Sequence, residues 1–431
     1  MIRNENFNIN EKGHLSIESV DSLDLASEFS TPLYVVSRNE LLRNIRTIKT
    51  ALNESLERST AAYASKALAC KEIFRIIDEE GLSLDVASSG ELATAMSVEF
   101  PAERIYFHGN NKNEKDIRYA LECGIGCFVI DNLYELRTIN RIAIEKGIVQ
   151  KSLLRVKPGV SAHTHHHIIT GAEDSKFGLP IERTELYAIL DELNDCKGIK
   201  LTGIHCHIGS QITEFTPFIE TAGIMISLFK DINDRYNFNL DEISLGGGFG
   251  IPYLEDQKVP ASSEFIQVIS ESIKELCGSL GISVPRIIFE PGRSIIGSAG
   301  MTLYTIGSIK RIKDIKTYVA VDGGMADNIR YALYQADYVF DIAGKVSEHK
   351  GFKASIAGRC CETGDLLGED VLIQTPETGD VLAVYPTGAY NYSMASNYNR
   401  LPRPAMVMVD GDKAYEIVRR ETIEDLLQYD I

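Results

Sequence analysis

The sequence predicts an α/β protein: a (β/α)8 TIM barrel followed by a C-terminal all-β domain of Greek-key or barrel-like type. Between residues 33 and 291, eight short apolar runs alternate with amphipathic helical patterns, and each run ends at polar or glycine residues. After Arg293, short β-rich segments with Gly-Asp or Asp-Gly turns replace this alternation. Eight βα units predict a parallel sheet that closes on itself, and an open doubly wound sheet is the alternative.

Each element is expected from its own local pattern. The barrel strands are short apolar runs, at residues 61–64, 82–86, 104–107, 127–130, 153–156, 201–205, 242–245 and 286–289. The helices have apolar residues at helical spacing, at residues 90–98, 114–122, 133–146, 182–193, 217–236 and 263–280. The β-domain segments are expected at residues 302–311, 317–321, 352–356, 371–373, 381–385, 405–409 and 413–419. We expect a barrel domain over residues 33–291 and a β-domain made of residues 1–32 and 292–431.

Composition limits the classes of function. The 431 residues are 44% hydrophobic and 24% charged, so the chain can bury a large core. The formal net charge of -17 argues against nucleic acid or an anionic membrane as a partner. The eight cysteines form no CxxC pair, no apolar run is long enough to cross a membrane, and the N-terminus does not resemble a signal peptide. These features predict a reduced, cytoplasmic setting.

The strand ends carry the candidate chemistry. Lys66 ends the first expected strand, and a lysine amine can form a Schiff base with an aldehyde, although most such lysines are solvated surface groups. Gly246 to Gly248 end the seventh strand, where backbone amides can approach an anion, although a tight barrel corner would also need glycine. With Ser210 and Gly292 after the neighbouring strands, a phosphate site is expected at the barrel mouth. Pyridoxal 5′-phosphate has both the aldehyde and the phosphate.

Ten motifs along the chain carry a resemblance to a known family. They are YASKA, SLDVASSGEL, FHGNNK, HTHHHIITGAEDSKFG, HCHIGSQ, LGGGFGI, EPGRS, VDGGMADNIRYALY, CCETGD and GAYNYSMASNYN. From Thr31 to Arg403 the chain resembles the diaminopimelate decarboxylases, which belong to the fold-type III, alanine-racemase-like pyridoxal-phosphate enzymes. The resemblance implies a homodimer with active sites at the interface. It also implies decarboxylation of meso-2,6-diaminopimelate to L-lysine and CO2, the last step of lysine biosynthesis.

The same resemblance implies roles for individual residues. The groups that look catalytic are Lys66, which would form the Schiff base, His207, which would stack on the cofactor ring, and Cys361, which would donate a proton from the other subunit. The groups that look cofactor-binding are Lys66, Asp85, His207, Ser210, Gly246, Gly247, Gly248, Glu290, Pro291, Gly292, Arg293 and Tyr390. The groups that look substrate-binding are Arg293, Arg330, Tyr334, Glu362 and Tyr390.

Physical chemistry supports two of these roles. An acid such as Glu290 keeps the pyridine nitrogen protonated, so the ring can accept the electron pair left by CO2, whereas the similar alanine racemases place an arginine there. Arg293 and Arg330 could bind the distal carboxylate of diaminopimelate, and a substrate without that carboxylate would leave both charges unpaired. A relative acting on carboxynorspermidine or a carrier-bound glutamyl group, a racemase, and a non-catalytic regulatory binder are the alternatives.

Several residues have a plainer interpretation. Cys361 on its own would more often be a small buried hydrophobe, and only the CCETGD context favours a proton donor, with Cys360 structural. Asp85 could simply cap the next helix. We expect no metal site, because the cluster His163, His165, His166 and His167 lacks flanking Cys or acidic ligands. Residues 160–178 are the candidate lid.

Overall fold

The computed structural model describes residues 6–160, 175–181 and 184–431, and the chain divides into two compact units. The barrel unit comprises Ile45–Ile251 and Val259–Ser294. The β-rich unit comprises Met1–Asn44, Pro252–Lys258 and Ile295–Ile431. Among the described residues, no helix combines the length and the apolar character needed to cross a membrane.

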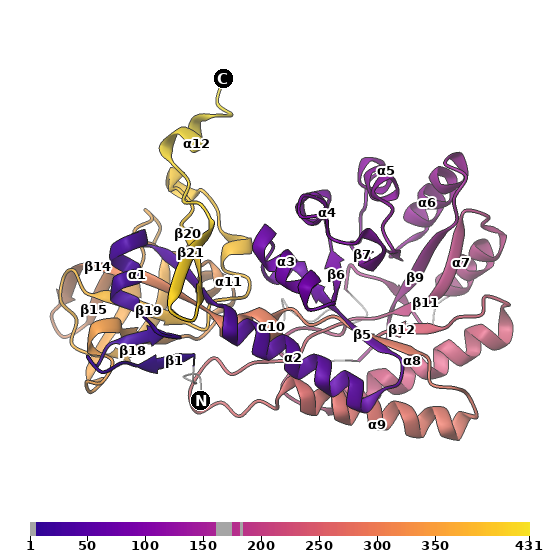
Figure 1. The fold of residues 1–431 in the computed structure, drawn as a ribbon, viewed down its shortest axis with the longest axis horizontal. Coiled ribbons are helices and arrows are strands. Elements are labelled where there is room, and N and C mark those ends of the chain that lie inside the picture. The colour runs from indigo at the N-terminus through magenta and orange to yellow at the C-terminus, as the bar shows by residue number, and fades with distance from the viewer. Residues whose placement is uncertain (1–5, 161–174, 182–183) are drawn as a thin grey trace. The chain divides into compact units, whose positions relative to one another are not determined.

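Eight parallel strands close into a barrel (Figure 1). They are β5 (Ser59–Ala64), β6 (Ser83–Val86), β7 (Ile105–Phe107), β8 (Cys127–Ile130), β9 (Gln150–Lys157), β11 (Ile199–His205), β12 (Glu242–Ser244) and β13 (Arg286–Phe289). Each strand pairs with the next, and β13 pairs with β5, where Ile288 lies opposite Thr60. This last pairing confirms the predicted closed barrel and excludes the open sheet.

Helices connect the barrel strands. They are α3 (Lys71–Glu79), α4 (Ser89–Met96), α5 (Glu114–Cys123), α6 (Leu133–Glu145), α7 (Thr184–Asp195), α8 (Thr216–Arg235) and α9 (Ser262–Leu280). Local sequence fixes their ends: α5 begins at a capping box between Asn113 and Asp116 and ends at Gly124, which is left-handed with φ 71°. Caps of this kind satisfy the free backbone groups at the helix ends and set where each helix begins and ends.

The barrel is filled by side chains from alternate strand positions. Ala62, Tyr106, Val129, Leu153 and Ile288 come from five different strands and form one buried cluster with Cys127. Because successive strand residues point to opposite sides, the neighbours of these residues face the surrounding helices. The interior is therefore a packed core, and ligand chemistry is left to the strand ends.

The β-rich unit is built on a nine-stranded sheet. The main order is β18 (Leu366–Ile373), β17 (Phe352–Ala357), β15 (Lys316–Val321), β14 (Gly300–Ile312), β4 (Leu33–Ser37), β20 (Ala405–Asp410) and β21 (Lys413–Val418). Two further strands lie off this path: β19 (Val381–Tyr385) pairs with β14, and β16 (Val339–Ile342) pairs with β19. A separate three-stranded sheet contains β1 (Phe7–Ile9), β2 (Leu15–Ile17) and β3 (Val20–Asp21). The helices outside the barrel connections are α1 (Ser22–Phe29), α2 (Arg38–Ser55), α10 (Arg293–Ile296), α11 (Arg330–Tyr334) and α12 (Ile423–Leu427).

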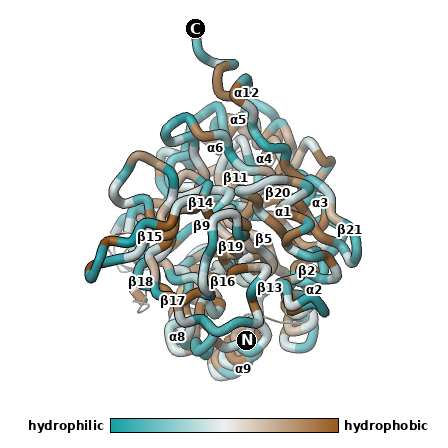
Figure 2. The backbone as a smooth tube through the Cα atoms, turned by 90° about the vertical axis from the view of Figure 1, so that its left-hand side faces the viewer, coloured by the Kyte–Doolittle hydropathy of each residue, from teal (hydrophilic) through white to brown (hydrophobic). Residues whose placement is uncertain are grey.

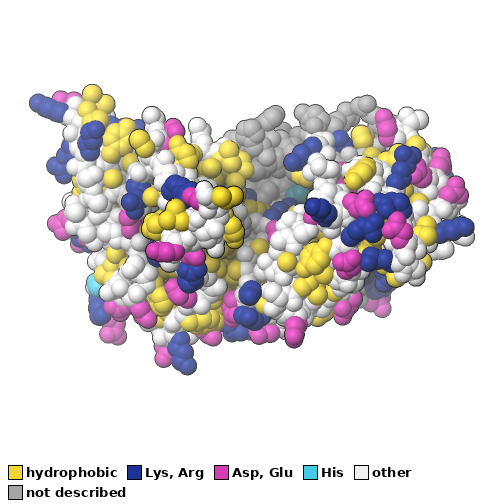
Figure 3. All heavy atoms as spheres, turned by 90° about the horizontal axis from the view of Figure 1, so that it is seen from above, with side chains coloured by type: hydrophobic (Ala, Val, Ile, Leu, Met, Phe, Trp, Pro, Cys, Tyr) yellow, Lys and Arg dark blue, Asp and Glu magenta, His cyan; other side chains and the backbone are white. Residues whose placement is uncertain are grey.

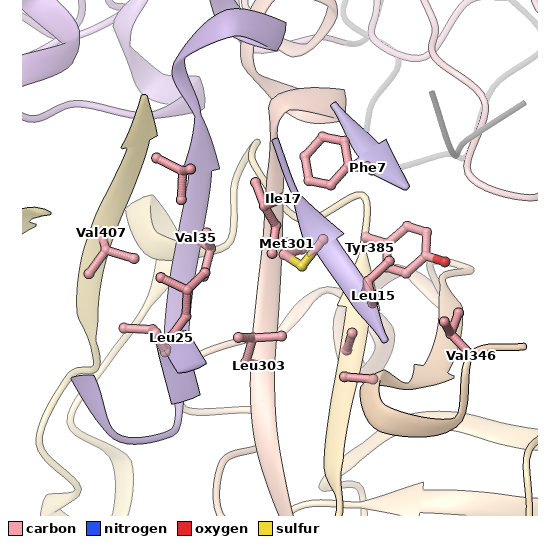
Figure 4. Close-up of a cluster of buried hydrophobic side chains, with 14 of the residues drawn as sticks. Phe7, Leu15, Ile17, Leu25, Val35, Met301, Leu303, Val346, Tyr385 and Val407 are labelled. Atoms are coloured by element: carbon pink, nitrogen blue, oxygen red, sulfur yellow. The ribbon is translucent and has the colours of Figure 1, made fainter. Parts of the chain in front are cut away.

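One apolar core joins the two sheets of this unit (Figure 4). Leu15 and Ile17 of the small sheet pack with Leu25 of α1 and with Met301 and Leu303 of β14. All five side chains are essentially inaccessible to solvent. Phe7, Leu15, Ile17 and Leu25 therefore belong to the core of the β-rich unit.

The limits of the two units differ from the expected ones in three places: residues 33–44 and 252–258 belong to the β-rich unit, and residues 292–294 belong to the barrel unit. The barrel domain is expected to begin at residue 33, whereas β4 starts at Leu33 and pairs with β14 and β20. These pairings place residues 33–44 in the β-rich unit. A single buried strand has the same sequence pattern whether it joins a barrel or a neighbouring sheet, because an apolar run does not indicate which strands it pairs with.

Charged side chains of both signs lie on the surface that Figure 3 shows. On the face that Figure 3 shows, basic and acidic side chains are interspersed and form no extended basic patch. Figure 2 shows a hydrophobic stretch at α12, close to the C-terminus. Ile423 and Leu427 of α12 are more than half exposed, so this short helix carries apolar side chains on its surface.

Candidate active site

The carboxyl ends of the barrel strands bring one group of polar residues together. Lys66 follows β5 in the short 3₁₀ helix Ser65–Ala67 and is exposed to solvent. Asp85 on β6, His108 after β7, His205 on β11 and Glu290 after β13 are all buried. The exposed lysine therefore stands beside buried titratable groups, an arrangement typical of catalytic centres.

Glu290 is the centre of the buried group. Its Oε1 accepts a hydrogen bond from the Ser244 hydroxyl at 2.7 Å, and its Oε2 lies 3.0 Å from Nε2 of His205. Nε2 of His108 lies 3.5 Å from Oε1 of Glu290 and 3.6 Å from Asp85, beyond good hydrogen-bonding distance. The carboxylate thus has donors on both oxygens, which is what a buried charge requires.

The pKa directions follow from this arrangement. Burial alone would raise the pKa of Glu290, but His205, His108 and the Ser244 hydroxyl hold it well below its ordinary value. Burial lowers the pKa of His205 and His108, and the cations Arg155 and Lys66 lower it further. Burial and the charge of Glu290 raise the pKa of Asp85. These directions favour the charged form of Glu290, whose two oxygens face the Ser244 hydroxyl and Nε2 of His205.

Three of these residues were not among the predicted site residues: His108, His205 and Ser244. His205 begins the HCHIGSQ motif and Ser244 lies two residues before the triglycine, so both were near recognised signals. Ser244 and His205 lie 46 and 85 residues from Glu290 in the sequence, and spacing along the chain does not reveal such contacts.

Glycines shape a cradle at the ends of β12 and β13. Gly246 and Gly248 have φ of 68° and 114°, values that L side chains rarely adopt. A Cβ on Gly247 would lie 2.0 Å from the carbonyl oxygen of Glu290. A Cβ on Gly292 would crowd Ala64 and Ala67 at 3.0 and 3.1 Å, so that glycine lets the end of β13 lie against the Lys66 segment.

The cradle is bordered by His207, Ser210 and Arg293. The Gly247 amide donates to Nδ1 of His207 at 3.3 Å, which leaves Nδ1 as the acceptor nitrogen. Burial, and then Lys66, lowers the pKa of His207 well below its usual value, so the ring is neutral. Nη2 of Arg293 donates to Ser210 Oγ at 3.0 Å. A hydroxyl, a guanidinium and close backbone amides are suitable ligands for a phosphate.

These residues fit pyridoxal phosphate. Among the described residues, Nδ1 of His205, Nε2 of His108 and Oγ of Ser65 are buried without a hydrogen-bond partner, so polar groups are left over for a ligand. The lysine suits the aldehyde, the ionised Glu290 suits the pyridine nitrogen, and the glycine cradle suits the phosphate.

A second group lies in the β-rich unit around Arg330. The Arg330 guanidinium lies 5.5, 5.6 and 6.0 Å from the ring centres of Tyr334, Tyr390 and Tyr253, and its side chain is 8% exposed. Burial disfavours the charge, but the tyrosines Tyr253, Tyr338 and Tyr390 leave its pKa raised. In the described part of the chain, Nε of Arg330 has no hydrogen-bond partner and no acidic group forms an ion pair with this residue. This cation is therefore available for an anion.

Backbone conformation sets Tyr390 apart. Its φ is 64°, in the left-handed region where a bulky residue is uncommon. Strain of this kind persists only where surrounding structure imposes it, and it is concentrated at functional sites. Tyr253, the third ring near Arg330, was not predicted, because it stands in a loop with no recognisable motif.

The structure also places the remaining predicted residues. Cys361 and Glu362 are exposed in the β-rich unit, whereas Cys360 is buried and has a pKa raised to about 11 by burial and by Asp365. The histidine cluster at residues 163–167 and most of the candidate lid lie outside the described residues. At the end of that segment, Gly178 N donates to Asp131 at 2.9 Å, and the Arg155 guanidinium lies 4.4 Å from the Phe177 ring centre.

The predicted residues therefore fall into two groups, each within one unit. The barrel unit holds the cofactor candidates Lys66, Asp85, His207, Ser210, Gly246, Gly247, Gly248, Glu290, Pro291, Gly292 and Arg293. The β-rich unit holds the candidates Arg330, Tyr334, Cys361, Glu362 and Tyr390.

Comparison with known proteins agrees with this geometry. Residues 38–297 match the family model described as "Pyridoxal-dependent decarboxylase, pyridoxal binding domain". The chain is 46% identical to the diaminopimelate decarboxylase of Bacillus subtilis (strain 168), over 98% of this chain and 96% of that protein. It is 44% identical to the diaminopimelate decarboxylase of Bacillus methanolicus, over 96% of each.

Solved structures give the same result. The crystal structure of the diaminopimelate decarboxylase of M. jannaschii in complex with L-lysine matches with a TM-score of 0.92 and 34% identity, over 100% of this chain and 99% of that one. The match extends over both units. The chain belongs to the diaminopimelate decarboxylase family of pyridoxal-phosphate-dependent enzymes.

Proposed function

We propose that this protein decarboxylates meso-2,6-diaminopimelate to L-lysine and CO2, the last step of lysine biosynthesis, with pyridoxal phosphate as cofactor. The observation that carries the substrate assignment is the buried Arg330 guanidinium, which has no acidic partner among the described residues and is surrounded by tyrosines. Such a cation binds a distal carboxylate strongly, and a substrate lacking one would leave it unpaired. The relatives named above carry the same activity in their names.

The barrel residues would hold the cofactor. Lys66 would bind its aldehyde carbon, the carboxylate of Glu290 would bind the pyridine nitrogen, and His207 would lie on the ring face. Ser210, Gly246 to Gly248, the backbone of Pro291 to Arg293 and Tyr390 would hold the phosphate, and Asp85 would lie near Lys66. When bound, pyridoxal phosphate supplies an electron sink for the bond to the departing CO2. Glu290, ionised by its two donors, favours the protonated pyridine that makes this sink strong.

The β-rich unit would supply specificity and a proton. Arg293 and Arg330 would bind the distal carboxylate, and Glu362 would accept from the distal ammonium, with Tyr334 and Tyr390 completing the pocket. The Cys361 thiol would return a proton to Cα after CO2 leaves. Its exposure in this chain suits a group that must meet substrate, whereas buried Cys360 with its raised pKa does not.

Assembly and location are part of the proposal. We infer a homodimer in which each subunit contributes Cys361 and Glu362 to the other subunit's site, and a cytoplasmic location. The exposure of both residues supports the first inference. The acidic composition and the cysteine usage support the second.

The activity is tested with purified protein and added pyridoxal phosphate. We expect lysine and CO2 from meso-diaminopimelate and little product from ornithine, lysine or carboxynorspermidine, because only the first substrate has a complete distal amino acid for Arg330 and Glu362. Product is measured by CO2 release and amino-acid chromatography. Faster turnover of another substrate would overturn the assignment of Arg330.

Replacement of the lysine tests the cofactor linkage. The variant Lys66→Ala should lack the visible absorbance of lysine-bound pyridoxal phosphate, because no other amine would take its place at the end of β5. Lys71→Ala, which removes an exposed lysine at the start of α3, is the matched control and should keep the absorbance. A normal spectrum for Lys66→Ala would show that another lysine binds the cofactor.

Replacement of a cradle glycine tests the phosphate site. In Gly247→Ala the added methyl group would collide with the Glu290 carbonyl. The backbone must shift to remove this clash, and the shift should weaken cofactor binding by about tenfold or more. Gly223→Ala in α8, where a Cβ meets no atom within 4 Å, is the control. Cofactor affinity is measured by fluorescence titration, and equal affinities for both variants would exclude the cradle.

Replacement of the thiol tests the proton donor. Cys361→Ala should bind cofactor normally but turn over about 10² to 10⁴ times more slowly, the usual range for a lost general acid. Cys123→Ala, at the C-terminal end of α5, should retain full turnover. Turnover of Cys361→Ala equal to that of the unmodified protein would remove this thiol from the mechanism.

A further inference from the structure

The segment from Cys360 to Glu362 is held at three successive residues by other side chains. The Cys360 amide donates to Asp365 Oδ2 at 2.6 Å, and the Cys361 amide donates to Asn399 Oδ1 at 2.7 Å. The hydroxyl of Tyr398 lies 3.4 Å from Oε2 of Glu362. Exposed loops more often bond to water, so three side-chain contacts in a row indicate a segment whose position matters.

Asp365, which is buried, is the first of the residues that hold the segment from Cys360 to Glu362. Its other oxygen, Oδ1, accepts from the Met325 amide at 2.6 Å, so one carboxylate joins two loops. Gly324 and Gly358 leave the space for it, because a Cβ on either would lie within 2.4 Å of Oδ1. The carboxylate is 3% exposed and is therefore fixed by packing as well as by hydrogen bonds.

Asn399, which is exposed, is the second residue that holds this segment. Its φ is 52° and that of Arg400 is 57°, so two consecutive residues are left-handed. Asparagine tolerates this conformation better than most residues, and it also supplies an acceptor oxygen. The turn therefore aims the Asn399 side chain at the Cys361 amide.

The turn is itself anchored at both ends. Nδ2 of Asn397 donates to Glu421 at 2.6 Å, and Nη2 of Arg400 donates to the Leu426 carbonyl at 3.0 Å and to Asp430 at 2.8 Å. The C-terminal residues thus hold residues 397–400 in place. Because the Cys361 amide donates to Asn399, the position of Cys361 is restricted as well.

We propose that Asn399 is a positioning residue that, together with Asp365, sets the place of the Cys361 thiol for proton transfer. The proposal rests on the proposed function, in which Cys361 returns the proton to Cα. With the amides of Cys360 and Cys361 both fixed, the sulfur position depends mainly on rotation about one Cα–Cβ bond. Proton transfer needs the two heavy atoms about 2.6–3.2 Å apart, and misplacement by about 1 Å can cost about a hundredfold in rate.

The test compares Asn399→Gly with Asn399→Asp in the cofactor-loaded protein. Glycine accepts the left-handed backbone but removes the acceptor, whereas aspartate keeps an acceptor oxygen. We expect Asn399→Gly to lower kcat about 10-fold with KM changed by less than about 2-fold, and Asn399→Asp to stay within about 3-fold of the unmodified protein. Asn239→Gly is the matched control, because Asn239 is also exposed and left-handed, with φ 56°, but lies in the barrel unit.

A second readout does not depend on turnover. Amide hydrogen exchange of a peptide covering residues 358–366 should become faster in Asn399→Gly, at the position of Cys361, and stay unchanged in Asn399→Asp and Asn239→Gly. A general loss of structure would instead lower the melting temperature and alter kcat and KM together, and that outcome would overturn the proposal. Unchanged kcat or unchanged exchange in Asn399→Gly would overturn it as well.

Failure of the proposed function would be recognised separately. If the unmodified protein released no lysine from meso-diaminopimelate, the activity assignment would fail, whereas the exchange experiment would still show whether Asn399 holds the Cys361 amide. Slow turnover in both Asn399→Gly and Asn399→Asp with unchanged exchange would assign Asn399 a role other than positioning.

Discussion

The barrel site depends on one buried carboxylate that is kept charged. Glu290 is 6% exposed, and a lone carboxylate in that environment would take up a proton. The Ser244 hydroxyl and the His205 ring prevent this by donating to its two oxygens. Ser244 also accepts from the Gly246 amide at 3.2 Å, so the same hydroxyl connects the charged group with the glycine cradle. The buried carboxylate and the glycine cradle thus share one hydrogen-bond network.

The β-rich unit also contains buried charges, one positive and one negative. Arg330 is a buried cation surrounded by aromatic rings, and Asp365 is a buried anion whose oxygens accept from two backbone amides. The anion is satisfied within the chain, whereas the cation has an Nε without a hydrogen-bond partner among the described residues. A satisfied buried charge is stabilised by the chain alone, whereas an unsatisfied one leaves a donor available for a ligand.

Much of the barrel was predictable from the sequence, because its signals are local. Each of the eight strands was found within about three residues, and Gly246 to Gly248 stand where the amino-acid pattern placed them. Contacts between distant segments were not predictable. His205 with Glu290, Tyr253 with Arg330 and Asn399 with Cys361 are pairs more than 35 residues apart, and nothing in their spacing indicates them. The short strand β16 was missed as well, because its four residues resemble an ordinary loop segment.

The pairing of β4 has a consequence for how the chain is made. This strand begins at residue 33, yet its neighbours β14 and β20 begin at residues 300 and 405. Domains generally fold as they emerge during synthesis, and pairings of high sequence separation are slow to form. All eight barrel strands leave the ribosome while β4 still lacks both partners. The β-rich unit therefore completes its central sheet last, and its apolar N-terminal strands remain exposed until nearly the whole protein has been translated.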